Sequence, residues 1–169
     1  FKINGVATDY IQIVEGSSGV APIWVDKTGQ NRIIVIPGAN NLISDSKAID
    51  SLKTIGNIDV LVGQFEIPME VNEAVFSYAF KNGVTTVLNP APAGKPSDTL
   101  LKNTSWFIPN EIEFEEIYGE TFNEQNLLSF ASDLQTNVVV TLGEKGCAYV
   151  KDNSVIIFET ESVNSVDTT

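Results

Sequence analysis

Residues suited to phosphate binding stand together after the apolar run Val138–Val140. Glycines allow successive backbone N–H groups to turn toward one anion, and a Lys ammonium adds positive charge. The pattern favours an anion site, although a tight turn into the next strand explains the same residues. The segment is Thr141, Leu142, Gly143, Glu144, Lys145 and Gly146.

Carboxylates and an amide follow two other apolar runs. Glu66 comes after Ile58–Val62 between apolar neighbours, where its carboxylate could accept hydrogen bonds from polyol hydroxyls or interact with the start of the next helix. Asn110 and Glu113 follow Trp106–Ile108, and this spacing is typical of a helix cap. The same spacing could place both side chains at a crevice, holding the water shell of Mg²⁺.

Composition excludes several other chemistries. The chain has 169 residues, no histidine and one cysteine, so it can form no Ser-His-Asp triad, no His-metal site and no intrachain disulfide. A single cysteine fits a reducing compartment, and we expect a cytoplasmic protein. The net charge of −12 disfavours nucleic acid as a partner, and no apolar run is long enough to span a membrane.

Alternating strand and helix patterns must position these residues. Apolar runs that could form a parallel sheet alternate with helical patterns, which indicates an α/β core covered on both faces. The expected strands are Ile58–Gly63, Val84–Leu88, Trp106–Ile108 and Val138–Leu142, followed by Cys147–Lys151 and Val155–Phe158 across an Asp152-Asn153 turn. The expected helices are Ser46–Ile55, Glu70–Lys81, Asn110–Tyr118 and Glu124–Leu134.

The first part of the chain has a different pattern. Three β-rich runs, Tyr10–Val14, Val20–Val25 and Arg32–Ile36, are separated by turn compositions, which predicts an antiparallel meander. Because three strands are near the minimum for an independent sheet, we expect this unit to pack against another element.

These strand exits, in this order, resemble the ribokinase family of ATP-dependent sugar and nucleoside kinases. The likeness covers the whole chain, and the Asn-Pro-Ala-Pro-Ala run is specific within that family. The motifs that carry it are Gly16–Val25, Gly38-Ala39-Asn40, Gln64–Pro68, Asn89–Ala93, Pro109–Glu113, Thr141–Gly146 and Val166-Asp167-Thr168-Thr169.

The resemblance implies a fold and a domain organisation. Residues 1–37 would be a small antiparallel β lid that closes over the sugar and forms a homodimer contact. Residues 38–169 would be a doubly wound parallel sheet core of the ribokinase-like type, incomplete at both ends. The family's first stretch, with a sugar-binding Asp and a Gly-Gly turn, would precede Phe1. Its general base would follow Thr169, so the fragment alone is expected to be inactive.

The resemblance also assigns roles to the candidate residues, with ATP, Mg²⁺ and K⁺ as cofactors. Ala21, Ile23 and Ile33 match lid positions that pack on the sugar, and Glu66 matches the carboxylate that binds it. The nucleotide phosphates would meet Asn110 and the Thr141–Gly146 turn, and Glu113 would contribute to the Mg²⁺ water shell. Asp167 and the carbonyl of Thr169 would bind a monovalent cation, usually K⁺.

The expected activity is transfer of the ATP γ-phosphoryl group to the 5-hydroxyl of ribose. Two alternatives remain open. The acceptor could be a related carbohydrate or a nucleoside, because most residues that decide it would lie before Phe1. The chain could instead be a non-catalytic remnant that only binds nucleotide or dimerises.

Overall fold

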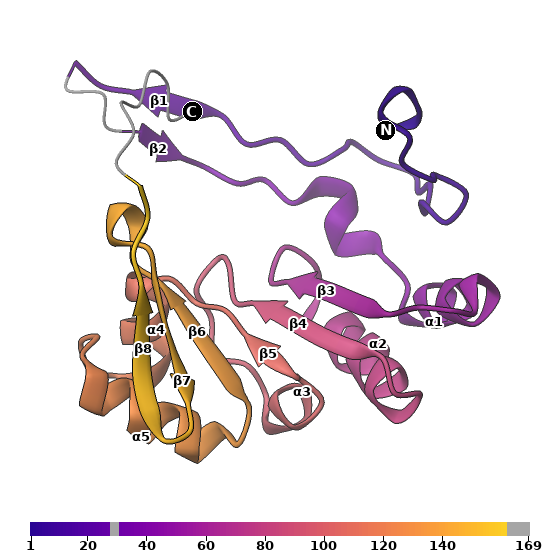
Figure 1. The fold of residues 1–169 in the computed structure, drawn as a ribbon. Helices are drawn as coiled ribbons and strands as arrows, with labels where there is room; N and C mark the ends of the chain where they lie inside the picture. The colour runs from indigo at the N-terminus through magenta and orange to yellow at the C-terminus, as the bar shows by residue number, and fades with distance from the viewer. Residues whose placement is uncertain (28–30, 162–169) are drawn as a thin grey trace.

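A six-stranded sheet forms the body of the chain in the computed structural model, which describes residues 1–27 and 31–161 (Figure 1). The strands lie in chain order, parallel from β3 to β6 and antiparallel from β6 to β8. Their bounds are β3 Val60–Gln64, β4 Thr85–Asn89, β5 Trp106–Phe107, β6 Asn137–Thr141, β7 Cys147–Lys151 and β8 Ser154–Phe158. This confirms the predicted α/β class. The first and last residues of every predicted core strand lie within two residues of the observed bounds.

Five α-helices accompany the strands of the described residues. They are α1 Asp45–Ile55, α2 Met69–Lys81, α3 Asp98–Lys102, α4 Glu111–Tyr118 and α5 Glu124–Leu134. Short 3-10 turns occur at η1 Lys2–Asn4, η2 Gly38–Leu42 and η3 Gly143–Lys145. The sequence predicted every α-helix except α3, whose five residues are too few to show a periodic apolar face.

The helices α2 to α5 cover one face of the sheet and bury its core. Alternate residues of the strands point into this layer, so Leu88 and Val140 are fully buried while Val62 on the opposite face is 65% exposed. In Figure 1 the helices α2, α4 and α5 lie behind the strands. Aromatic rings fill the layer under β5 and β6, with the Phe114 and Phe130 ring centroids 5.1 Å apart.

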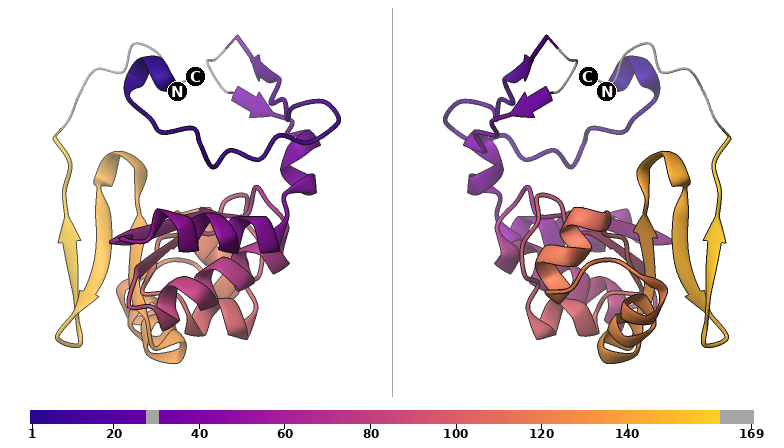
Figure 2. Two further views of the ribbon diagram at one scale, coloured as in Figure 1. Left: turned by 90° about the vertical axis from the view of Figure 1, so that its right-hand side faces the viewer. Right: turned by 90° about the vertical axis from the view of Figure 1, so that its left-hand side faces the viewer.

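A separate two-stranded ribbon stands above the sheet, as the side views in Figure 2 also show. It consists of β1 Ile23–Val25 and β2 Asn31–Ile33, paired antiparallel with Ile23 opposite Ile33. Pro22 has no backbone N–H to donate, which shortens the ladder on that side, and an isolated bridge between Val20 and Ile36 continues the pairing.

The prediction of a third lid strand at residues 10–14 was wrong. This segment lies against the start of α1 instead. The Gln12 side chain donates to the Ser44 carbonyl at 3.1 Å and accepts from the Ser44 N–H at 3.0 Å. A contact between two residues 32 positions apart in the chain thus replaces strand pairing, and no local sequence pattern indicates this contact. The division into residues 1–37 and 38–169 remains a prediction.

None of the described helices has the length and apolar content that a membrane span requires.

Candidate functional site

The carboxyl ends of the parallel strands open toward the space beneath the β1–β2 ribbon (Figure 1). Ligands of open α/β sheets bind at this edge because the loops that leave the strands converge there. The structure brings the predicted residues into two groups along the edge, one beside β3 and the other beside β6.

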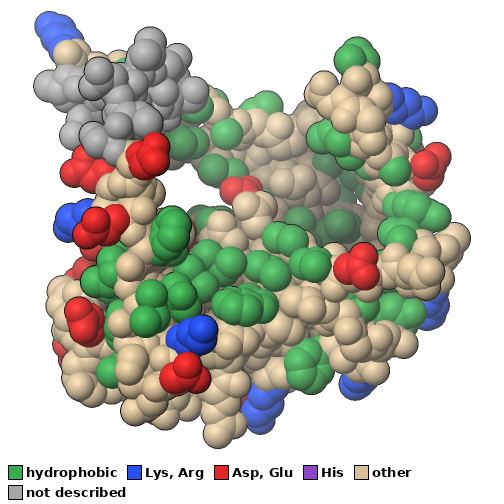
Figure 3. Space-filling view, in the orientation of Figure 1, with side chains coloured by type: hydrophobic (Ala, Val, Ile, Leu, Met, Phe, Trp, Pro, Cys, Tyr) green, Lys and Arg blue, Asp and Glu red, His purple; other side chains and the backbone are tan. Residues whose placement is uncertain are grey.

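The first group surrounds Glu66, which is half-buried in the loop between β3 and α2. A cavity of about 350 Å³ joins this carboxylate to the ribbon segments above it, and Figure 3 shows the open space between the two parts. Its lining is Ser18, Gly19, Val20, Ala21, Val35, Ile36, Pro37, Asn40 and Glu66. A cavity lined by one carboxylate, other polar groups and apolar side chains suits a ligand with both hydroxyl groups and a hydrocarbon surface.

Among the predicted lid residues, only Ala21 lines this cavity. Ile23 and Ile33 face each other in the ribbon, and their side chains are 46% and 52% exposed. Their proposed contact with a sugar therefore stays a prediction.

Sequence reasoning assigned no role to Asn40, the polar residue that lines the cavity from η2. Its motif, Gly38-Ala39-Asn40, was among those that carried the family resemblance, and this was the available signal. The turn is held against the lid because the Ala39 N–H donates to the Ser17 carbonyl at 2.9 Å.

The second group begins with Asn110 and Glu113 at the start of α4. The Asn110 side chain accepts from the Glu113 N–H at 2.8 Å, and Glu113 Oε2 accepts from the Asn110 N–H at 2.8 Å. This reciprocal capping box accounts for the residue types and their spacing without a ligand. Glu113 is 7% exposed, so the magnesium role predicted for it is not needed to explain its position.

The turn after β6 lies beside this cap. A parallel bridge joins Asn110 to Thr141, whose N–H donates to the Pro109 carbonyl at 2.9 Å. The predicted phosphate-binding residues from two strand exits are therefore neighbours in space, although they are about 30 residues apart in the chain.

Inside the turn, three amides are already used. The N–H group of Leu142 donates to the Gly146 carbonyl at 2.8 Å. The N–H groups of Lys145 and Gly146 donate to the carbonyls of Leu142 and Gly143 at 3.1 Å each. The amides of Gly143 and Glu144 begin the 3-10 helix, and the turn makes no use of them itself. The expected anion nest is thus narrowed to these two N–H groups together with the Lys145 ammonium.

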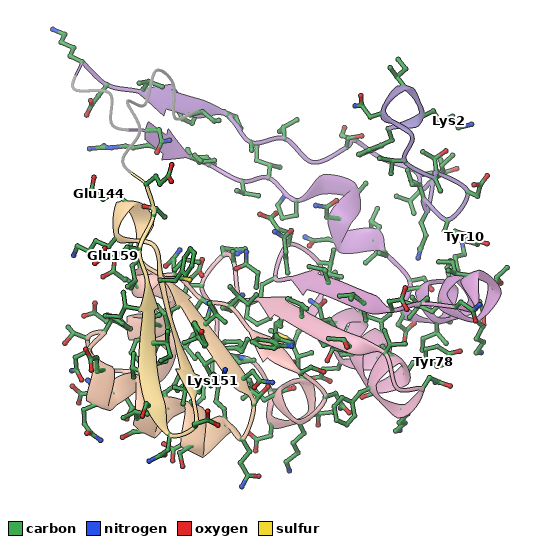
Figure 4. All side chains as sticks on the ribbon, viewed as in Figure 1. Lys2, Tyr10, Tyr78, Glu144, Lys151 and Glu159 are labelled. Carbon is green, nitrogen blue, oxygen red and sulfur yellow. The ribbon has the colours of Figure 1, made fainter. Side chains whose placement is uncertain are left out.

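A cavity of about 580 Å³ adjoins the turn and carries excess negative charge. Glu144 and Glu159 lie at the same end of the β6–β7–β8 unit (Figure 4), and Glu111 also lines the cavity. Lys145 is the cationic residue among its lining side chains. Phe122, Leu142 and Ile157 supply an apolar wall against which a planar ring could pack.

The two predicted cation ligands, Asp167 and Thr169, lie outside the described residues. Among residues that the structure describes, no three carboxylate or thiol side chains cluster closely enough to hold a metal ion.

Comparison with known proteins gives matches over the whole chain. Residues 1–169 match the pfkB family carbohydrate kinases. The ribokinase of Staphylococcus aureus is 36% identical over 175 residues, which cover 100% of this chain and 58% of that protein. The deoxyribokinase of Salmonella typhi is 31% identical over 171 residues, which cover 97% of this chain and 56% of that protein.

A solved structure of Arabidopsis thaliana ribokinase, complexed with ribose and ATP, superposes with a TM-score of 0.81 at 26% identity. The match covers 96% of this chain and 55% of that one. The chain thus spans little more than half the length of these relatives.

Proposed function

The chain belongs to the pfkB family of carbohydrate kinases, and from this premise we propose that the parent protein phosphorylates ribose with ATP. The parent protein is here the product of the complete gene. It would transfer the γ-phosphoryl group to the ribose 5-hydroxyl. The observation that carries the proposal is the cavity that Glu66 and Ala21 of the lid both line, at the same ends of the strands as the Thr141–Gly146 turn.

At the sugar end, Glu66 would accept hydrogen bonds from ribose hydroxyls. The side chains of Ala21, Val35 and Ile36 would cover the hydrocarbon face of the ring and exclude water. Ile23 and Ile33 would join this apolar cover if the ribbon moves toward the sheet edge when sugar binds. Together these contacts would hold the acceptor hydroxyl in line with the phosphoryl group, and positioning of this kind dominates phosphoryl transfer.

At the nucleotide end, ATP would lie against the turn after β6. The amides of Gly143 and Glu144, the Lys145 ammonium and the side chain of Asn110 would meet its phosphates. Because Glu111, Glu144 and Glu159 surround this place, the polyphosphate needs a counter-ion. Mg²⁺ bound to the phosphates would supply that positive charge, and Glu113 would orient part of its water shell.

A monovalent cation would complete the site through Asp167 and the carbonyl of Thr169. The support for this is the family resemblance of the Val166–Thr169 motif. We expect the parent protein to be faster in K⁺ than in a buffer free of Na⁺ and K⁺, and Asp167→Ala to abolish that difference. Equal rates for the unmodified protein in both buffers would contradict the assignment.

The lid would also form the contact of a homodimer. Trp24 and Val25 of the ribbon and Ile34 directly after it are each 55% exposed, which is unusual for apolar side chains that have no partner in the assembled protein. We place the protein in the cytoplasm, where sugar kinases find ATP and where the single Cys147 would stay reduced.

The decisive experiment is a coupled ATP-consumption assay on the parent protein. Ribose is compared with deoxyribose, a ketose and a nucleoside at equal concentrations. We expect the highest kcat/KM with ribose. A preference for deoxyribose would favour the activity of the Salmonella typhi relative, and nucleotide binding without any turnover would support the non-catalytic alternative.

A further inference from the structure

The peptide between Gln64 and Phe65 leads from β3 into the loop that carries Glu66, and it forms hydrogen bonds with two other parts of the chain. The Gln64 carbonyl accepts a hydrogen bond from Asn72 Nδ2 at 2.7 Å. The Phe65 N–H donates to the Ala91 carbonyl at 2.9 Å. Because both groups belong to one planar unit and point in opposite directions, the pair of bonds fixes the rotation of that plane.

The donor on the carbonyl side is an unusual residue for its surroundings. Asn72 lies on α2 and is 1% exposed, among the buried side chains Val71, Val75 and Phe76. Within the described part of the chain its Oδ1 atom has no hydrogen-bond partner. A buried, half-satisfied amide costs free energy, and an apolar residue would avoid that cost.

The helix and strand approach too closely for this amide to point elsewhere. A Cβ atom at Gly63 would lie 2.5 Å from the Phe76 ring and 3.0 Å from Asn72 Oδ1. The absence of a side chain at Gly63 thus allows α2 to sit directly on the β3 backbone. This places the Asn72 amide within reach of the next residue's carbonyl.

We propose that Asn72 is a positioning residue for sugar binding, which acts on Glu66 through the Gln64–Phe65 peptide. The proposal rests on the proposed function, in which Glu66 binds the sugar. Without the Asn72 donor, the peptide is held on one side only. The Glu66 carboxylate then samples several directions, and fewer of them meet the sugar hydroxyls.

The test replaces Asn72 in the parent protein by Leu, which has a similar size and no donor. We expect the ribose KM to rise about three- to tenfold, while kcat and the ATP KM stay within about twofold. The melting temperature should fall only modestly, because the variant removes the unpaired Oδ1 atom while it leaves the Gln64 carbonyl without its donor. If Asn72→Leu does not fold, the same constants are measured on Asn72→Ser, because the shorter serine side chain cannot bring its hydroxyl to the Gln64 carbonyl.

A matched control separates positioning from stability. Asn103 Nδ2 also donates to a backbone carbonyl, that of Thr99, at 2.7 Å, and in addition to Ser77 Oγ at 3.0 Å. It precedes β5 and so lies at the amino ends of the parallel strands, away from the sugar site. Asn103→Leu should lower the melting temperature and leave the ribose KM unchanged. An Asn72→Leu protein with normal ribose KM, or with ribose and ATP constants raised alike, overturns the proposal.

A double-mutant cycle distinguishes this proposal from the assignment of Glu66. In a Glu66→Ala background, Asn72→Leu should have no further effect on ribose KM, because nothing is left to position. If Glu66→Ala alone leaves the ribose KM normal, the proposed sugar site fails. If it raises the KM and Asn72→Leu does not, or if the two effects multiply, only the positioning role fails.

Discussion

The Glu66 carboxylate stands out at the scale of single residues because the other side chains of its cavity are uncharged. A carboxylate in such a place forms stronger hydrogen bonds with hydroxyl groups than it would in water. We predict that Glu66→Ala in the parent protein raises the ribose KM about tenfold to a hundredfold, which corresponds to one lost charge-assisted hydrogen bond. The ATP KM should stay unchanged, because the nucleotide turn follows a different strand. Initial rates at varied ribose and fixed ATP measure this.

The control is Glu70→Ala, which removes an exposed carboxylate from the first turn of α2. It should leave both Michaelis constants alone. Equal effects of the two substitutions on the ribose KM would mean that the overall negative charge of the protein, and not the position of Glu66, affects sugar binding.

Glu113 caps α4 through the capping box, and we also propose that it orients water on Mg²⁺. A conservative substitution separates the two roles. In Glu113→Gln the side-chain oxygen can still accept from the Asn110 N–H, whereas the negative charge is lost. We predict that unfolding free energy changes by less than about 1 kcal/mol, while the Mg²⁺ concentration needed for half-maximal rate rises. Glu113→Ala should show the same change in Mg²⁺ dependence and should in addition lose about 1 kcal/mol of unfolding free energy. An unaltered Mg²⁺ dependence in Glu113→Gln would leave only the capping role.

At the scale of elements, the turn after β6 depends on one glycine. Gly146 has a φ of +97°, and a Cβ atom there would overlap the carbonyl oxygen of Phe158 at the end of β8. We predict that Gly146→Ala destabilises the chain by about 2 kcal/mol or more, because the turn must separate from β8 as well as accept backbone strain. Thermal or urea unfolding followed by circular dichroism measures the loss.

Gly56→Ala is the matched comparison. Gly56 ends α1 with a φ of +77°, and among the described residues, its two chain neighbours aside, no heavy atom lies within 4 Å of the place its Cβ would take. Its substitution should cost about 1–2 kcal/mol, from backbone strain alone. If both alanine variants lose the same stability, contact between Gly146 and β8 contributes nothing.

Elements whose ends carry local signals could be predicted from the sequence. Ser44, Asn110 and Asn123 each accept a backbone N–H at the start of a helix, as residues of these types commonly do. Asp152 and Asn153 both adopt positive φ, at 48° and 59°, and close the β7–β8 hairpin as their types indicate. These interactions span only a few residues, so local composition is enough to reveal them.

Features that depend on distant contacts could not be predicted. Residues 10–14 have strand-like composition, yet Gln12 binds Ser44 and the ribbon keeps two strands. Asn40 reaches the cavity because η2 turns toward the β3 exit, and Asn72 holds the Gln64 carbonyl because α2 packs closely on Gly63. Each outcome depends on the mutual placement of two elements, which no periodic pattern encodes.

At the scale of the whole molecule, β3 has a strand partner on only one side in the described part of the chain. Its outward face is apolar, with Val60 and Val62 at 51% and 65% exposure, and a cavity of about 490 Å³ with a largely apolar lining lies between this strand, α1 and α2. An edge strand with unpaired backbone groups and apolar side chains is a template for pairing with another chain.

We therefore predict that the 169-residue chain, produced by itself, associates through β3 and that Val62→Lys reduces this association. The charged side chain opposes the approach of a second β3 edge, since desolvating an ammonium at such a junction is costly. The comparison is Ile112→Lys, which introduces the same charge at an apolar side chain on α4 that is 69% exposed. Sedimentation velocity at several protein concentrations should show Val62→Lys shifted toward the monomer and Ile112→Lys behaving as the unmodified chain. Equal shifts in the two variants would mean that net charge governs the association, because the edge is altered in only one of them.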